Sequence, residues 1–218
     1  EVLTVYDGED MDQIAEESGI SSEEVVRLHS AKEYRVYAVG FTPGFAYMGT
    51  TDDRLNLPRR STPRTQVPAG SVAIAMGQTG IYPSTTPGGW HLIGRAEHRT
   101  LFDPNANPPS RFVAGDRVRF VPVNELERVE ELSPSPPLCA HPNFVVEDGG
   151  FLTTVQDLGR FGFQRYGVPV AGAVDSLALS EANELVGNES NSAALECTVA
   201  GPRLRCLQPT SVAITGAN

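Results

Sequence analysis

Arginines cluster in a stretch of the chain that contains no acidic residue. Arg54, Arg59, Arg60 and Arg64 all fall within residues 54–64. A guanidinium group is planar and binds carboxylate or phosphate through paired N–H donors. We therefore predict that Arg59, Arg60 and Arg64 bind an anion. The alternative is a solvated basic edge that pairs with the acidic N-terminal segment.

Two glycine-rich turns follow the arginines, at residues 77–83 and 87–94. Glycine lets a backbone approach a ligand closely, and its N–H groups can then meet an anion. Polar side chains in these turns could orient a ligand, and the histidine could titrate near neutral pH or simply pack. The candidates are Gln78, Thr79, Tyr82 and His91.

A second polar group lies in the C-terminal third of the chain. Gln156, Asp157 and Arg160 follow a strand expected at residues 151–155. Asp175 precedes a segment with helical spacing, which favours a helix N-cap over a catalytic acid.

The composition excludes several mechanisms. Lysine occurs once, at Lys32, without the serine-rich context of a Ser-Ser-Lys amidase. A Gly-Lys-Ser/Thr phosphate loop is absent, and no His/Cys spacing suits structural zinc, so we expect no metal site. The net charge of −10 argues against nucleic acid as a partner.

Hydrophobic periodicity predicts a mainly β chain with short helices. Two helices are expected within residues 7–30, the second opened by a capping box between Ser21 and Glu24. A third helix should begin at Asp175 and end at Gly187. Turn residues separate most of the strands, as in an all-β barrel. Strands are expected at residues 34–39, 71–76, 90–95, 117–123, 144–146, 151–155 and 211–215.

A proline-rich stretch divides the chain. Residues 133–142 contain Ser-Pro-Ser-Pro-Pro and one further proline, which cannot extend a β-ladder. We expect one domain in residues 1–132, this linker, and a second domain in residues 143–218. The sequence Ser-Val-Ala-Ile occurs at 71–74 and again at 211–214, which hints that both halves share a module.

Cysteine usage predicts the cellular compartment. Cys139, Cys197 and Cys206 are an odd and sparse set, typical of reduced thiols in a cytoplasmic protein. No apolar run approaches the roughly 18 residues of a membrane span, and the acidic start is no signal peptide. We expect a cytoplasmic protein without a membrane partner.

Ordered blocks along the whole chain resemble two known protein families. Residues 34–45, 58–68, 77–83 and 87–94 are similar in order and spacing to PxpB (KipI) proteins. Residues 150–160, with Thr-Thr-Val-Gln-Asp-Leu-Gly-Arg at their end, resemble the opening of PxpC (KipA) proteins. Further blocks similar to PxpC lie at 167–169, 172–175, 182–183, 185–188, 195–196, 201–202 and 213–217.

The chain is thus similar to a PxpB/PxpC fusion, a type also known as allophanate hydrolase subunit 1 and subunit 2. The resemblance implies a cyclophilin-like β-barrel with short helices, followed by the start of a second cyclophilin-like module. PxpB relatives usually carry a further N-terminal domain and PxpC relatives continue further, so we expect an internal fragment of the fusion.

The resemblance implies a component of an ATP-dependent 5-oxoprolinase, which opens 5-oxo-L-proline to L-glutamate together with a PxpA (LamB/YcsF) subunit. It implies ATP with Mg²⁺, no tightly bound cofactor, and a chain inactive without PxpA and the remaining parts of the fusion. Whether the protein is a homo-oligomer is left open. The alternatives are a KipI/KipA-type regulator of a sensor histidine kinase and a protein associated with allophanate hydrolase or urea carboxylase.

The resemblance gives the polar residues roles in this reaction. Positive groups should stabilise the negative charge that develops when a lactam is activated. The candidate catalytic residues are Gln78, Tyr82, Gln156 and Asp157. The candidate substrate- or anion-binding residues are Arg59, Arg60, Arg64, Thr79, His91 and Arg160.

Overall fold

The computed structural model describes residues 1–97, 100–126 and 143–216. The predicted linker at 133–142, together with Cys139, lies outside these residues.

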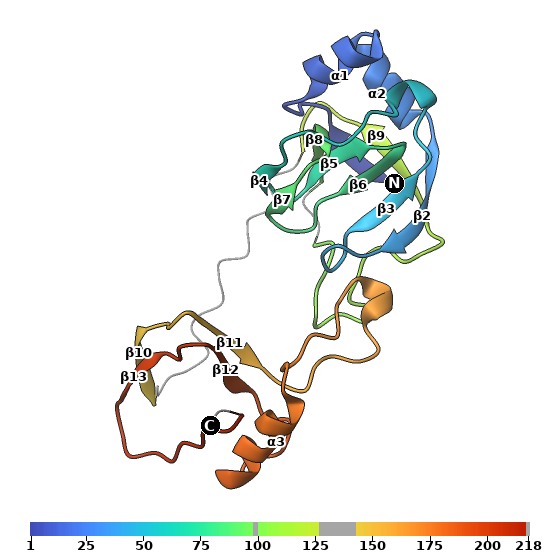
Figure 1. Ribbon diagram of the computed structural model, residues 1–218. Helices are drawn as coiled ribbons and strands as arrows, with labels where there is room; N and C mark the ends of the chain where they lie inside the picture. Colours follow the sequence, from blue (N-terminus) through green and yellow to red (C-terminus); the bar gives the residue numbers. More distant parts are fainter. Residues whose placement is uncertain (98–99, 127–142, 217–218) are drawn as a thin grey trace. The chain divides into compact units, whose positions relative to one another are not determined.

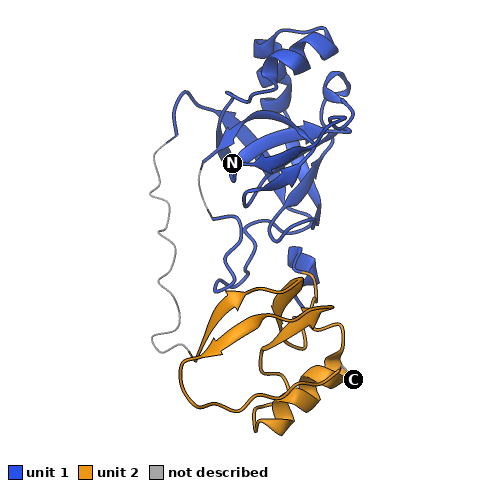
Figure 2. Cartoon of the chain, turned by 60° about the vertical axis from the view of Figure 1, so that its left-hand side comes forward, with its two compact units in different colours: residues 1–130, 162–168 blue, residues 131–161, 169–218 orange. Residues whose placement is uncertain are grey.

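The chain divides into two compact units, which Figure 2 shows in different colours. The first unit comprises residues 1–130 and 162–168, and the second comprises residues 131–161 and 169–218.

The first unit is built around a closed β-barrel (Figure 1). Its strands follow the order β1-β8-β5-β6-β3-β2-β9, and a parallel pairing of β1 with β9 closes it. Closure gives every barrel strand two neighbours and removes the exposed sheet edges. The mainly β prediction, with a barrel and short helices, is confirmed. The barrel strands are β1 (Val2–Val5), β2 (Glu33–Val39), β3 (Ala46–Gly49), β5 (Ser71–Ala75), β6 (Gln78–Ile81), β8 (His91–Ala96) and β9 (Arg117–Pro122).

The most deeply buried strand of this barrel is β5. All five of its residues are buried, because hydrophobic clusters cover both of its faces: Val72 and Ile74 pack in one cluster, and Ala73 and Ala75 in another. A two-stranded ribbon of β4 (Arg64–Val67) and β7 (Thr86–Gly88) accompanies the barrel. Arg64 lies on this ribbon and His91 on β8, so both elements carry candidate residues of the first unit.

Two helices, α1 (Met11–Ser18) and α2 (Ser22–Ser30), lie together at one end of the barrel (Figure 1). Gly19 ends α1 with a left-handed φ of 66°, as a helix C-cap requires. A short 3₁₀ turn, η1 (Asp53–Leu55), contacts α1, and a second, η2 (Gln164–Tyr166), contacts β2.

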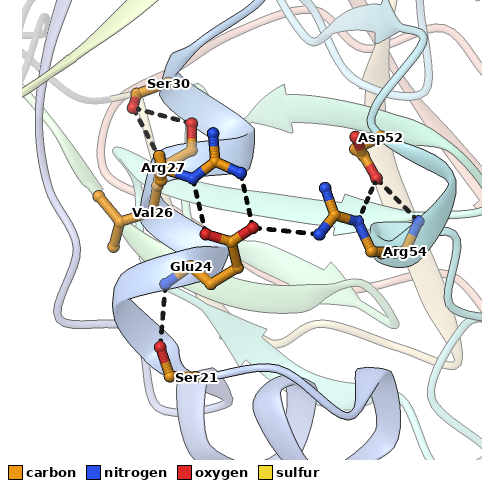
Figure 3. A network of polar contacts seen from close by, with 7 residues as sticks. All are labelled: Ser21, Glu24, Val26, Arg27, Ser30, Asp52 and Arg54. Atoms are coloured by element: carbon orange, nitrogen blue, oxygen red, sulfur yellow. Dashed lines mark hydrogen bonds and ion pairs between the residues drawn. The ribbon is translucent and has the colours of Figure 1, made fainter.

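The predicted capping box at the start of α2 forms in one direction. Ser21 Oγ accepts a hydrogen bond of 3.2 Å from the Glu24 N–H (Figure 3). The Glu24 carboxylate instead accepts from Arg27 at 2.6 Å and from Arg54 at 3.1 Å. Arg54, in turn, donates to Asp52 at 3.0 Å, so this network ties α2 to η1.

A neutral histidine lies in the core of the barrel. His29 is fully buried, and its Nε2 lies 2.8 Å from Thr79 Oγ1. The Thr79 hydroxyl donates to Ala73 O, so it must accept from an Nε2–H. Nδ1 therefore accepts from the Tyr6 hydroxyl at 2.7 Å. Both ring nitrogens are satisfied in the neutral tautomer, and burial lowers the pKa of His29 to about 3.

The described residues of the second unit form two strand pairs and a helix. β10 (Phe144–Asp148) pairs with β13 (Arg203–Cys206), and β11 (Leu152–Gln156) pairs with β12 (Ala194–Thr198). The helix is α3 (Ser176–Leu185).

The caps predicted for α3 are confirmed. Asp175 is its N-cap, and its Oδ1 accepts from the Ala178 N–H at 2.9 Å. Gly187 follows the helix with a left-handed φ of 78°. Within the described ranges, no helix is long and apolar enough to cross a bilayer.

One predicted strand is wrong. Residues 211–215 form no strand, and Val212 and Ile214 are exposed, whereas the matching sequence at 71–74 lies in buried β5. The repeated four residues therefore do not mark a shared element among the described residues. The described strands that the sequence did not predict are β1, β3, β4, β6, β7, β12 and β13.

The buried histidine predicts a pH dependence of stability. The pKa of histidine in an unfolded chain is about 6.5. Below that pH the unfolded chain binds a proton at residue 29, whereas the folded protein keeps His29 neutral. Stability should be complete above pH 6.5 and should fall toward the folded pKa of about 3. Between pH 7 and pH 5 this site should cost the folded state about 2 kcal/mol.

Urea unfolding at the two pH values measures this cost. The variant His29→Gln does not titrate and should lose about 2 kcal/mol less than the wild type over the same interval. Equal losses in both proteins would show that His29 does not carry the effect.

Candidate functional site

Two arginines of the predicted anion site converge on one buried carboxylate. Asp10, just before α1, is 3% exposed. Its Oδ1 accepts from Arg60 Nη1 at 2.6 Å and from Arg64 Nη2 at 2.8 Å. Its Oδ2 accepts from the Leu92 N–H at 2.7 Å. Glu9, which is largely exposed, adds a longer contact of 3.3 Å to Arg64.

The backbone fixes these arginines in place. The Arg60 N–H donates to Gly89 O at 2.8 Å, and Arg64 pairs with Gly88 across the β4–β7 ribbon. His91, at the start of β8, holds the same segment because its Nε2 lies 2.9 Å from Pro58 O. The residues that precede β4 are therefore held against the residues that lead into β8.

Charge favours the ionised form of Asp10. Burial alone would raise the pKa of its carboxyl, but hydrogen bonds from Arg64 and Leu92 and the charges of Arg64 and Arg60 outweigh it. The pKa of Asp10 is therefore lowered from its ordinary value. The anchoring carboxylate stays charged at neutral pH.

The predicted alternative for the arginines, pairing with the acidic N-terminal segment, is what the structure shows for Arg60 and Arg64. These side chains are not a solvated edge, since their exposed fractions are 26% and 19%. Three buried nitrogens nevertheless have no hydrogen-bond partner among the described residues: Arg60 Nε, Arg64 Nη1 and His91 Nδ1. These atoms keep hydrogen-bonding capacity for solvent or a ligand.

Arg59 differs from its two neighbours. It is exposed, and within the described part of the chain no ion pair involves it. Its charge and that of Arg64 act on Tyr82, whose pKa is raised by burial and only partly lowered by a Trp90 hydrogen bond and these arginines. Tyr82 is thus a buried neutral phenol, and its ring packs on Phe45 at 5.2 Å.

Gln78 and Thr79 lie on β6. Their contacts in the described residues are with elements other than the arginine cluster. Thr79 is fully buried and belongs to the His29 network. Gln78 is half-buried, at the point where β6 pairs with β3 and β5. No contact in the described residues joins either side chain to Arg60 or Arg64, and their predicted roles remain predictions.

The three predicted polar residues of the second unit line one cavity. Its volume is about 240 Å³. The lining residues are Val155, Gln156, Asp157, Arg160, Ala171, Gly172 and Ala193.

Two glycine-containing loops build this cavity. The Arg160 N–H donates to Val170 O at 2.8 Å, and the Ala173 N–H donates to Asp157 O at 2.9 Å. Gly172 has a φ of 97°, and a Cβ there would lie 2.9 Å from the backbone nitrogen of residue 159. Only glycine allows this close approach of the two loops.

Metal ligation has no support in the described residues. They contain no group of three or more histidine, cysteine, aspartate or glutamate side chains that could hold an ion.

Known families match both halves of the sequence. Residues 1–112 match the family described as "Carboxyltransferase domain, subdomain C and D", and residues 166–218 match "Carboxyltransferase domain, subdomain A and B". The chain belongs to this carboxyltransferase-domain family and is a PxpB/PxpC-like fusion, as its sequence blocks indicated.

Individual relatives agree with this division. The B subunit of 5-oxoprolinase from Bacillus subtilis is 47% identical over 128 residues, which cover 57% of this chain and 53% of that protein. The C subunit of 5-oxoprolinase from Haemophilus influenzae is 45% identical over 64 residues, which cover 29% of this chain and 21% of that protein. The chain thus spans about half the length of the Bacillus subtilis relative.

One solved structure is similar over nearly the whole chain. The crystal structure of TTHA0988 is 40% identical in sequence, with a TM-score of 0.77. The similarity covers 95% of this chain and 42% of that one.

The anchoring carboxylate yields a prediction for stability. Asp10→Asn keeps an acceptor for Leu92 but leaves two partly buried guanidinium charges without their anion. We expect the free energy of unfolding at pH 7 to fall by roughly 3 kcal/mol. Because the folded pKa of Asp10 is lowered, its stabilisation is present above the unfolded value of about 3.9 and is lost as the pH falls further.

Denaturant unfolding from pH 7 to pH 3 measures this effect, and the gap between wild type and Asp10→Asn should narrow toward pH 3. Asp7→Asn is the matched control, because Asp7 pairs with Arg95 on an exposed surface and should cost less than about 1 kcal/mol. A gap independent of pH, or equal costs for both variants, would contradict the assignment.

Proposed function

We propose that the chain is a component of an ATP-dependent 5-oxoprolinase that opens 5-oxo-L-proline to L-glutamate together with a PxpA (LamB/YcsF) subunit. The observation that supports this best is the joining of two kinds of relative in one chain. The first half is similar to proteins named as the B subunit of 5-oxoprolinase, and the second half to proteins named as its C subunit. A fusion of two subunits of one enzyme keeps them at high effective concentration.

The chemistry of the reaction fits the positive groups of the chain. A lactam is an unstrained amide, and its opening requires stabilisation of negative charge that develops on the carbonyl oxygen. Exposed arginines without an internal partner are suited to this task, because they need not break an ion pair to meet an anion. Arg59 in the first unit and Arg160 in the second have this property among the described residues.

ATP with Mg²⁺ would activate the lactam in this reaction, and the described residues identify no site for it. They contain no cluster of ligands for the ion, and the sequence contains no phosphate-binding lysine loop. We therefore assign neither ATP nor Mg²⁺ to a residue of this chain.

A coupled assay tests the proposal. The full-length fusion, mixed with a PxpA-type subunit, 5-oxoproline and ATP, should form glutamate and ADP, and the fusion alone should form neither. Glutamate and ADP are measured separately, so that uncoupled ATP hydrolysis is recognised. No coupled turnover with any matching PxpA-type subunit would refute the proposal.

Single arginine variants test which positive charge of the first unit contributes to turnover. Arg59→Ala should lower turnover by roughly tenfold or more, because it removes one charged donor without disturbing an ion pair. Arg119→Ala is the matched control, since Arg119 is an exposed arginine on β9. Unchanged turnover in Arg59→Ala, with an unchanged unfolding midpoint, would remove Arg59 from the site.

A further inference from the structure

The cavity of the second unit presents an unpaired cation. Arg160 is exposed and lines the cavity, and its backbone N–H is fixed to Val170 O. Within the described residues, its guanidinium group makes no ion pair and no hydrogen bond. Other arginines of this unit, Arg203 and Arg205, contact Glu147. Arg160 therefore retains its full set of five N–H donors for a ligand.

An acceptor lies on the same cavity wall. Asp157 Oδ1 accepts from the Gly159 N–H at 2.7 Å, a bond that orients the carboxylate. Its other oxygen has no hydrogen bond among the described residues, although Asp157 is half-buried. A carboxylate can only accept, so this oxygen would meet an N–H or O–H of a ligand.

Gln156, the third polar residue of the cavity, can both donate a hydrogen bond to a ligand and accept one from it. Gln156 ends β11, and its Nε2 donates to Thr154 Oγ1 at 3.2 Å. This bond leaves the amide oxygen and one amide hydrogen available. An unpaired cation, an oriented acceptor and an amide are thus combined in a cavity of about 240 Å³, which is the size for a small molecule rather than a peptide.

We propose that this cavity binds a small acid with an N–H group next to its carboxylate, with the carboxylate on Arg160 and the N–H on Asp157. An isolated anion would meet Arg160 favourably but would be repelled by Asp157. An N–H donor beside the carboxylate turns this repulsion into a hydrogen bond, so the pair selects for the combination. The inference rests on the proposed function only for the choice of 5-oxoproline as a ligand of this class.

Three ligands built on the same five-membered ring size separate the two contacts. 5-Oxoproline carries both the carboxylate and a lactam N–H, cyclopentanecarboxylate carries only the carboxylate, and 2-pyrrolidinone carries only the lactam. Binding to the full chain is measured by calorimetry or ligand-observed NMR, without ATP and without any other protein. 5-Oxoproline should bind roughly tenfold or more tightly than either of the other two.

Variants assign each contact to its residue. Arg160→Gln should weaken 5-oxoproline binding by roughly tenfold or more and leave 2-pyrrolidinone binding unchanged. Asp157→Asn keeps an acceptor for Gly159 but removes the charge, so it should weaken 5-oxoproline and strengthen cyclopentanecarboxylate. Arg203→Gln, an exposed arginine of the same unit outside the cavity, should change neither.

Two results of the binding measurements would overturn the inference: no detectable binding of 5-oxoproline, or binding that Arg160→Gln leaves unchanged. These results differ from a failure of the proposed function. Binding that depends on Arg160 without any coupled turnover would refute the enzymatic role alone. Coupled turnover in the full fusion that is insensitive to Arg160→Gln would refute this cavity alone.

Discussion

The buried carboxylate of Asp10 is the contact on which the arginine-bearing face of the first unit depends. It joins residues 50, 54 and 82 positions further along the chain, namely Arg60, Arg64 and Leu92. The chain before α1 lies tightly on β8, since a Cβ on Gly8 would lie 2.2 Å from Leu92 O. A charge buried this deeply is stable only with its partners in place, so β8, the ribbon and the start of α1 must assemble together.

This constraint changes the chemistry that Arg60 and Arg64 can perform. Two positive charges face one deeply buried negative charge, and three buried nitrogens of the cluster remain without partners in the described residues. An incoming anion would gain the N–H groups of Arg60 Nε and Arg64 Nη1 but would also be repelled by Asp10. The arginine pair is therefore first of all a structural element, and any anion it meets must approach from the side opposite to the carboxylate.

Local features of the structure were predictable from sequence, and distant ones were not. The caps at Ser21 and Asp175 depend on residues three positions away, so the sequence shows both partners. Strands β3 and β6 contain glycine and are only four residues long, which weakens their periodic signal. Residues 211–214 repeat the sequence of β5 but find no strand partners in the described chain, because strand formation depends on neighbours as well as on propensity.

The difference between local and distant contacts also explains which candidate residues could be grouped from the sequence. Gln156, Asp157 and Arg160 are close in sequence and share one cavity, although the loop that completes it, at Ala171 and Gly172, gave no chemical signal. For the partly buried pair of Arg60 and Arg64, the acidic composition of the N-terminal segment indicated a partner, but ten acids precede residue 35 and nothing in their spacing singled out one of them.

An arginine already neutralised by a buried carboxylate gains less from a ligand than one without a partner. Arg60 and Arg64 would have to share or release Asp10, at a cost of several kcal/mol for a buried charge left unpaired. Arg59 and Arg160 have no such cost in the described structure. Anion recognition should therefore depend most on these two exposed side chains, and the pair of Arg60 and Arg64 should influence it mainly by holding the segment that carries Arg59.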